Sequence, residues 1–413
     1  MAEQAEVPEI RFAGFTDPWE QRKLGNCGTT YSGLSGKTKE DFGHGNARFV
    51  PYTNVFDNPL ADTERLEAVE IDSSQNKVAY GDVFFTVSSE TPDEVGMSSV
   101  WLSDQDDVYL NSFCFGYRQD STFDPHYLAY MLRSSSIRSD LTLLAQGISR
   151  FNISKNKVME LSVAVPSAAE QKQIGQYFAR LDSLITLHQR KYDKLVVFKK
   201  SMLEKMFPKD GESVPEIRFA GFTDPWEQRK LEDIANRVTR KNEGESDLPL
   251  TISSQYGLVD QRTFFNNQVA SKDMSGYYLL RKGEFAYNKS TSGDSPWGAV
   301  KRLVRYEKGC VSTLYICFGL DGADPDFLVT YYETDRWYKA VQMIAAEGAR
   351  NHGLLNIAPN DFFDTALILP PSREEQELIG LFFARLDNLI TLHQRKLELL
   401  RNIKKSLLDK MFA

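Results

Sequence analysis

The stretch VPEIRFAGFTDPWEQRKL at residues 7–24 recurs letter for letter at residues 214–231. A second match follows each copy, because EQKQIGQYFARLDSLITLHQRK at residues 170–191 aligns with EQELIGLFFARLDNLITLHQRK at residues 375–396. Self-similarity over such lengths identifies an internal repeat. We therefore expect two tandem halves, each an entry segment, a divergent region and a long helix.

The divergent regions share weak landmarks, among them Gly147 with Gly348 and Asn152 with Asn356. Short strand-like runs such as 83–87 and 311–318 alternate with loops and with helical stretches at 125–133 and 324–341. We predict a mixed α/β (α+β) fold for each region. The predicted segments are 1–165 (entry segment and first divergent region), 166–213 (first long helix and linker), 214–370 (entry segment and second divergent region) and 371–413 (second long helix).

The two long helices carry their own start signals. Ser167 with Glu170 and Ser372 with Glu375 form capping boxes just after prolines. A seven-residue apolar repeat follows, which is typical of a helix packed along another helix. Its predicted seam comprises Ile174, Leu181, His188 and Leu195 in the first helix, and Ile379, Leu386, His393 and Leu400 in the second.

This pattern favours an antiparallel coiled coil about a pseudo-two-fold axis. About forty residues at about 1.5 Å each extend about 60 Å, so the helices would act as spacers. His188 and His393 should lie close together as a polar layer that sets the register, and we favour this over a metal or catalytic role.

Composition limits the class of protein. The 413 residues suffice for two or three domains, and 41% apolar and 26% charged residues are ordinary for globular proteins. A net charge of -8 argues against a protein that coats DNA by bulk attraction, but it permits a specific reader. With no long apolar stretch and no signal-peptide pattern, we expect a cytoplasmic protein without a membrane anchor.

No catalytic or metal motif stands out. The four cysteines form no CxxC pair. GLSGKT at residues 33–38 lacks the first glycine of a phosphate loop. The pairs at 106–107 and 374–375 are interpreted as solvated acids or helix N-terminal charge, and Trp19 and Trp226 as packing anchors.

The order and duplication of these motifs resemble the specificity subunits of type I restriction-modification systems. The resemblance covers nearly the whole chain. Its carriers are PEIRFxGFxxxW at 8–19 and 215–226, GISRFNIS at 147–154, and the helix starts at Pro166 and Pro371.

The resemblance implies a non-catalytic chain in which each divergent region reads one half of a bipartite site in double-stranded DNA. It also implies two methyltransferase subunits and two restriction and translocase subunits as partners. No cofactor would be bound by this chain, since S-adenosylmethionine, ATP and Mg²⁺ would belong to those partners.

Base reading needs Arg, Lys, Asn, Gln or Ser side chains on loops. The candidates in the first region are Lys37, Lys39, Asn46, Arg48, Tyr52, Asn54, Ser149, Arg150 and Asn152. Those in the second are Ser253, Ser254, Gln255, Tyr256, Asn288, Lys289, Ser290, Ser292, Arg350, Asn351 and His352.

Two other interpretations stay open. One is a single-chain DNA methyltransferase or nuclease whose active site the motifs do not reveal. The other is a structural coiled-coil adaptor that never meets DNA.

Overall fold

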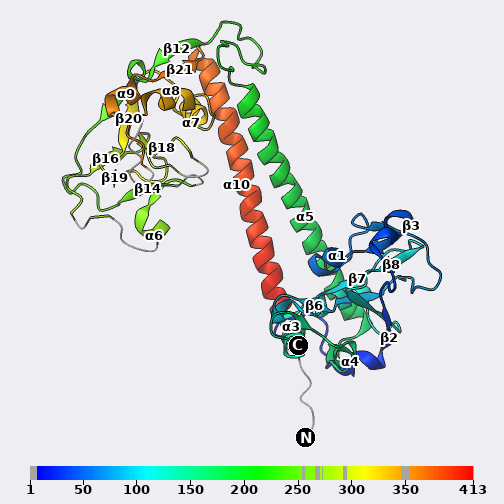
Figure 1. Cartoon of the computed structure of the whole chain (residues 1–413). Coiled ribbons are helices and arrows are strands. Elements are labelled where there is room, and N and C mark those ends of the chain that lie inside the picture. Colours follow the sequence, from blue (N-terminus) through cyan, green and yellow to red (C-terminus); the bar gives the residue numbers. More distant parts are fainter. Residues whose placement is uncertain are drawn as a thin grey trace. The chain divides into compact units, whose positions relative to one another are not determined.

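The computed structural model describes residues 7–253, 256–265, 270–271, 273–291, 295–345 and 354–412. The chain divides into two compact units (Figure 1). The first comprises Met1–Arg190 with Gln394–Ala413, and the second comprises Lys191–His393. The division falls inside both long helices, so each unit contains the first part of one helix and the last part of the other.

Each unit contains a four-stranded antiparallel sheet with the same strand order. In the first unit the order is β2 (Gly28–Ser32), β9 (Cys114–Gln119), β5 (Val83–Thr86) and β7 (Ser98–Val100). In the second it is β13 (Ala235–Val238), β20 (Ile316–Leu320), β17 (Phe285–Asn288) and β18 (Ala299–Arg302). The divergent regions therefore share one core topology.

The entry segment of each half pairs with the strand that leads into its long helix. These pairs are β1 (Glu20–Lys23) with β11 (Ser162–Val165), and β12 (Glu227–Lys230) with β21 (Ala366–Leu369). The entry segment of each half therefore lies beside the strand that precedes its own long helix.

The remaining strands differ between the regions. The first has β3 (Phe42–Val50) between β4 (Glu67–Val69) and β8 (Val108–Leu110), plus the short pair β6 (Ser88–Ser89) and β10 (Phe151–Asn152). The second has the hairpin β14 (Leu250–Ser253) and β15 (Gly257–Asp260), and the pair β16 (Tyr278–Arg281) and β19 (Lys308–Val311).

Short helices complete both regions. They are α1 (Tyr52–Asp57), α2 (Pro125–Met131), α3 (Ser135–Leu143) and α4 (Lys155–Met159), then α6 (Gln261–Phe265), α7 (Pro325–Tyr331), α8 (Tyr338–Ile344) and α9 (Pro359–Phe363). The helix predicted at 324–341 is wrong as a single element, because a turn separates α7 from α8.

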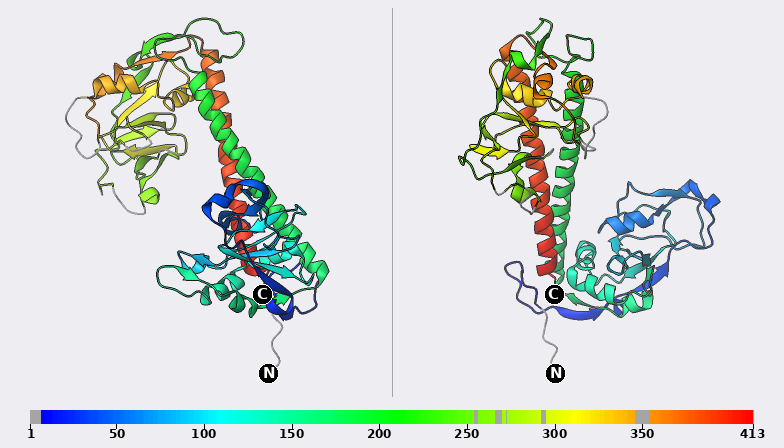
Figure 2. Two further views of the ribbon diagram at one scale, coloured as in Figure 1. Left: turned by 45° about the vertical axis from the view of Figure 1, so that its right-hand side comes forward. Right: turned by 60° about the vertical axis from the view of Figure 1, so that its left-hand side comes forward.

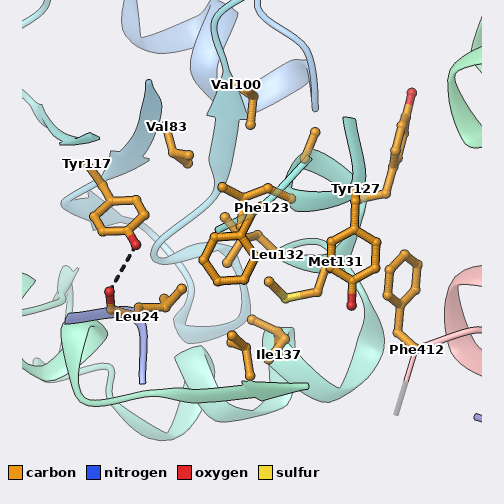
Figure 3. Packing of buried hydrophobic residues seen from close by; sticks show 14 of the residues in the cluster. Leu24, Val83, Val100, Tyr117, Phe123, Tyr127, Met131, Leu132, Ile137 and Phe412 are labelled. Carbon is orange, nitrogen blue, oxygen red and sulfur yellow. Dashed lines mark hydrogen bonds between the residues drawn. The ribbon is translucent and has the colours of Figure 1, made fainter. Parts of the chain in front are cut away.

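The core of the first unit contains residues from both ends of the chain (Figure 3). The buried Tyr117 hydroxyl donates to the Leu24 carbonyl at 2.9 Å. Phe412 lies 5.6 Å from Tyr127 and 5.6 Å from Phe178, measured between ring centroids. The KMF end of the second long helix therefore packs into the first region.

The second unit repeats this arrangement with the end of the first long helix. Phe207 lies 5.7 Å from Trp226 and 5.7 Å from Phe327. Trp226 is buried, as is Trp19 in the first unit. Each region therefore anchors the start of its own helix and the end of the other one.

The long helices are α5 (Ala168–Lys205) and α10 (Arg373–Lys410), each 38 residues without interruption. They begin where the capping boxes predicted. The hydroxyls of Ser167 and Ser372 accept from the backbone N–H groups of Glu170 and Glu375, both at 3.4 Å.

The glutamates of these boxes have a different role from the predicted one. Glu170 is fully buried and accepts from Arg11 Nε at 2.7 Å and Nη2 at 2.8 Å. Glu375 is also fully buried and accepts from Arg218 at the same two distances. The interpretation of Glu375 as helix N-terminal charge is confirmed, but Glu375 is not solvated, because the repeated entry segment supplies its buried counter-ion.

The two long helices run antiparallel within each unit (Figure 2). In the first unit Lys404 Nζ lies 2.5 Å from Asp182 Oδ1, and Arg401 donates to Gln189 at 3.0 Å. In the second unit Lys199 Nζ lies 2.5 Å from Asp387 Oδ1. Lys199 and Lys404 occupy equivalent positions of the repeat, so the same ion pair forms in both units.

The predicted seam residues differ in their burial. Ile174 and Leu181 are buried in the first unit, as are Ile379 and Leu386 in the second. Leu400 and Leu195 are partly buried against the respective cores. His188 and His393 are half-buried, and their mutual proximity stays a prediction.

Candidate nucleic-acid interface

A groove of about 940 Å³ lies on the first region. Its walls come from stretches that are far apart in the sequence, namely α1, the segment from β6 onward, and the turn before β10. The lining residues are Tyr52, Thr53, Phe56, Ser88, Ser89, Glu90, Thr91, Glu94, Phe113, Ser149 and Arg150. Three of the predicted contacts, Tyr52, Ser149 and Arg150, are thus brought together.

The turn that carries Ser149 and Arg150 is closed by backbone hydrogen bonds. Gln146 and Asn152 exchange two backbone hydrogen bonds of 2.9 Å. Gly147 has φ +146°, and a Cβ there would lie 2.0 Å from the Arg150 carbonyl oxygen. Glycine is required, and the turn presents Ile148 with 97% of its surface exposed.

Pairing of β6 with β10 sets this turn against the groove, with Asn152 opposite Ser88. The exposed Arg150 donates from Nη2 to the Ser88 hydroxyl at 3.2 Å. The guanidinium keeps further donors, whose fork geometry suits guanine O6 and N7 or a phosphate.

The opposite wall adds aromatic surface. Tyr52 stacks on Phe56 with a centroid distance of 5.9 Å, and its hydroxyl donates to the Ser88 carbonyl at 2.8 Å. Burial raises the pKa of Tyr52, so the hydroxyl stays protonated near neutral pH. Phe113 is 58% exposed.

Two carboxylates, Glu90 and Glu94, share the groove with Arg150. Carboxylates accept from the N4 amine of cytosine, whereas they repel phosphates. The mixture of guanidinium, carboxylate, hydroxyl and aromatic groups is therefore suited to base edges.

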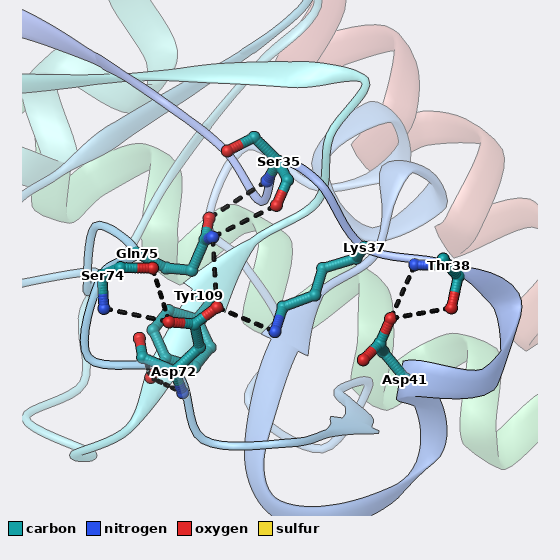
Figure 4. Close-up of polar contacts among 8 residues, drawn as sticks. All are labelled: Ser35, Lys37, Thr38, Asp41, Asp72, Ser74, Gln75 and Tyr109. Carbon is teal, nitrogen blue, oxygen red and sulfur yellow. Dashed lines mark hydrogen bonds and ion pairs between the residues drawn. The ribbon is translucent and has the colours of Figure 1, made fainter.

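Other predicted residues of the first region lie outside this groove. Lys37 pairs with Asp72 at 2.9 Å (Figure 4). Hydrogen bonds from Ser74 and then from Lys37 lower the pKa of Asp72, and Asp72 in turn raises the pKa of Lys37. Lys39, Asn46 and Asn152 are exposed.

The side chains of Asn54 and Arg48 donate hydrogen bonds to backbone carbonyls of nearby residues. Asn54 is fully buried, and its amide donates to the carbonyls of Asp62 at 2.8 Å and Arg65 at 2.9 Å. Arg48 donates to the carbonyls of Gly45 and Ala47. Both side chains therefore stabilise the conformation of neighbouring backbone segments.

The second region provides fewer of its predicted contacts. Tyr256 is 56% exposed at the tip of the β14–β15 hairpin, where its N–H donates to Ser253 at 3.2 Å. Asn288 accepts from the Ser290 N–H at 3.1 Å, and Lys289 donates to the Ile357 carbonyl at 3.3 Å. Burial lowers the pKa of Lys289. Ser254, Gln255, Ser292, Arg350, Asn351 and His352 lie outside the described residues.

One equivalence assumed between the regions needs correction. Ser88 pairs with Asn152, and in the second region the corresponding bridge joins Ser290 to Leu354. Asn356, which the sequence aligns with Asn152, lies two positions further along. The second region therefore has two more residues than the first between this bridge and the helix that follows it, α9 in the second region and α4 in the first.

Sequence analysis missed several groove residues, notably Ser88, Ser89, Phe113 and Glu94. The pairing of β6 with β10 brings Ser88 and Ser89 beside the turn at 147–150, and a hydrogen bond from the Val87 N–H to the Phe113 carbonyl at 3.0 Å places Phe113 next to β6. A strand pair of only two residues on each side has no recognisable local sequence pattern, so the sequence alone could not identify these groove residues.

The residues that the structure describes include neither a metal-binding cluster nor a membrane-spanning helix. They contain no cluster of three or more His, Cys, Asp or Glu side chains that could hold a metal ion. Among the helices described, none is both long enough and apolar enough to cross a membrane.

Comparison with known proteins finds similarity over part of the sequence and in the fold. Residues 16–196 match the family described as type I restriction modification DNA specificity domain. The chain is 26% identical over 112 residues to the putative type I restriction enzyme MjaX specificity subunit of Methanocaldococcus jannaschii, covering 26% of each chain. It is 24% identical over 171 residues to the type I restriction enzyme StySPI specificity subunit of Salmonella potsdam, covering 40% of this chain and 36% of that relative.

These alignments thus span between a quarter and just over a third of the curated relatives. The fold is similar to the crystal structure of a type I restriction-modification S subunit from M. genitalium, with a TM-score of 0.56, 14% identity and 99% of both chains covered. That likeness concerns the fold alone.

Proposed function

We propose that the chain is the specificity subunit of a type I restriction-modification system, because residues 16–196 match the DNA specificity domain of these systems and two curated relatives are specificity subunits by name. In this role it reads a bipartite site in double-stranded DNA and supplies no catalysis itself. The observation that carries the proposal is the repeated architecture: two regions with one sheet topology and different loops, each held between like entry strands and long helices.

Divergent loops on a common core suit two different half-sites. Each half-site offers its own pattern of donors and acceptors in the major groove, so the reading side chains must differ while the scaffold stays the same. In the first region the groove around Arg150 and Tyr52 is the proposed reading surface.

The long helices would form an antiparallel coiled coil that sets the unread gap. A helix of 38 residues is about 57 Å long at about 1.5 Å per residue. Equivalent ion pairs in each unit, Lys404 with Asp182 and Lys199 with Asp387, support a fixed register.

Two methyltransferase subunits and two restriction and translocase subunits are the proposed partners. They would carry S-adenosylmethionine, ATP and Mg²⁺, and the complex would work in the cytoplasm. A pair of identical partners needs two like surfaces, and exposed apolar residues of the repeated entry segment fit this need, including Ile10 with Ile217.

The alternatives make different predictions. The purified chain, incubated with S-adenosylmethionine and DNA, should transfer no methyl groups, and transfer without a partner would favour a single-chain methyltransferase. The complex assembled with its methyltransferase subunits should retain a bipartite oligonucleotide in preference to scrambled duplexes. Retention of none of the duplexes would favour the structural adaptor, and equal retention of every duplex would contradict sequence-specific reading.

A further inference from the structure

We propose that Arg133 and Arg138 are positioning residues that hold the two walls of the first groove and thereby set its base selectivity. The inference rests on the proposed function and deepens it. Neither side chain lines the groove, and both act through the backbone of segments that do.

Arg133 holds the wall formed by α1. Its Nη2 donates to the carbonyls of Val55 at 2.8 Å and Phe56 at 2.9 Å, and its Nε donates to the Ser98 carbonyl of β7 at 2.7 Å. The last carbonyls of a helix have no partner inside it and favour a cation. Arg133 therefore fixes the six-residue helix that carries Tyr52 and Phe56.

Arg138 holds the opposite wall. Its Nη1 donates to the Gly96 carbonyl at 2.9 Å, and its Nη2 donates to the carbonyls of Asp93 and Val95, both at 2.7 Å. These carbonyls flank Glu94, a lining residue of the groove. Arg138 thereby fixes the backbone on either side of that carboxylate.

Both guanidiniums are half-buried, and none of the ion pairs among the described residues includes either of them. Burial, and then the charge of Arg138, lower the pKa of Arg133 to about 10. The six hydrogen bonds described above all go to backbone carbonyls. A planar fork with several fixed donors can make such a set of bonds, whereas a lysine ammonium cannot reproduce it.

At the two equivalent positions, both of which the structure describes, the second region has no arginine. Asp124 and Asp324 cap α2 and α7 in the same way, which aligns Arg133 with Glu333 and Arg138 with Tyr338. Glu333 instead pairs with Lys199 of α5 at 2.7 Å. The arginine pair is therefore specific to the first region, as expected of a feature that serves one half-site.

The test uses the full chain assembled with its methyltransferase partners. The probes are duplexes that carry the bipartite site of the wild-type complex and single base-pair changes in either half. A well-read base pair should give roughly 5- to 100-fold discrimination in binding. Arg133→Lys and Arg138→Lys should each reduce discrimination in the first half-site about fivefold or more, while discrimination in the second half-site stays within about twofold.

Arg65→Lys is the matched control, because Arg65 forms an exposed ion pair with Asp57 in the same region. It should leave both half-sites unchanged. A uniform loss of affinity for all duplexes, or unchanged discrimination in folded variants, would overturn the inference while leaving the proposed function intact. If the Arg133→Lys chain fails to assemble with its methyltransferase partners, the discrimination measured for Arg138→Lys tests the inference alone. A wild-type complex with no bipartite preference would overturn the proposed function and this inference together.

Discussion

Glu170 and Glu375 show at the level of single residues why the entry segment is repeated. Each carboxylate is fully buried at the first turn of a long helix and bound at two oxygens by an arginine of the entry segment. A buried charge is tolerated only when it is paired and hydrogen-bonded. The two segments must therefore stay matched in both halves.

Replacement of this carboxylate should destabilise the chain strongly. Glu170→Gln leaves the Arg11 guanidinium without its counter-ion, and breaking a buried pair typically costs about 3 to 5 kcal/mol. Chemical denaturation of the variant measures this loss. Glu374→Gln, one position before the equivalent Glu375 and exposed, should change stability by less than about 0.5 kcal/mol.

The cysteines provide a second prediction. All four are buried as free thiols, and burial raises the pKa of Cys114 and Cys317 to about 12 and of Cys310 to about 11. Because the thiolate is the reactive form, alkylation of the native chain at pH 8 should be negligible. Mass spectrometry should find labelling only after denaturation, and rapid labelling of the native chain would contradict the buried positions.

At individual positions the sequence predicted residue types better than it predicted contacts. Arg150 and Tyr52 lie on one groove as a reading surface requires, whereas Asn54 is buried with its amide engaged. The three residues look equally suitable in the sequence. The difference arises from tertiary pairing, which composition and spacing do not encode locally.

At the level of elements, the two ion pairs between the long helices should fix their register. Lys404 and Asp182 are about three-quarters buried, so their pairing should contribute more than an exposed pair, about 1 to 2 kcal/mol. Lys404→Asp should destabilise the chain. Addition of Asp182→Lys should recover at least half of that loss, as measured by a double-mutant cycle in thermal unfolding. Additive effects of the two changes would show that the residues do not interact.

Element boundaries were predictable where the chain carries explicit local signals. Ser167 and Ser372 located the starts of α5 and α10 because capping is a local interaction. The break between α7 and α8 was not predicted, since its residues continue a helix-compatible apolar pattern through Trp337. Trp337 is buried in the second core, so packing determines that turn.

At the scale of the whole molecule, the length of the two long helices α5 and α10 should determine the number of base pairs between the half-sites. Insertion of seven residues after both Gln189 and Gln394 adds about 10 Å to each helix and keeps the heptad register. The preferred gap should then lengthen by about three base pairs, at about 3.4 Å per step.

Binding of duplexes with graded gaps by the assembled complex measures this change. Insertion into α10 alone is the control and should disturb the pairing of the helices. An unchanged preferred gap in the double insertion would show that the helices do not set the spacing.

The most direct test of a two-part DNA reader is a map of methylated adenines in cells that carry this chain with its partner subunits. The wild-type chain should give one motif of two short sequences separated by a fixed gap. Arg150→Ala should relax positions in one half only, at a cost of about 1 to 3 kcal/mol in discrimination. A single continuous motif, or methylation that is the same without this chain, would contradict the account.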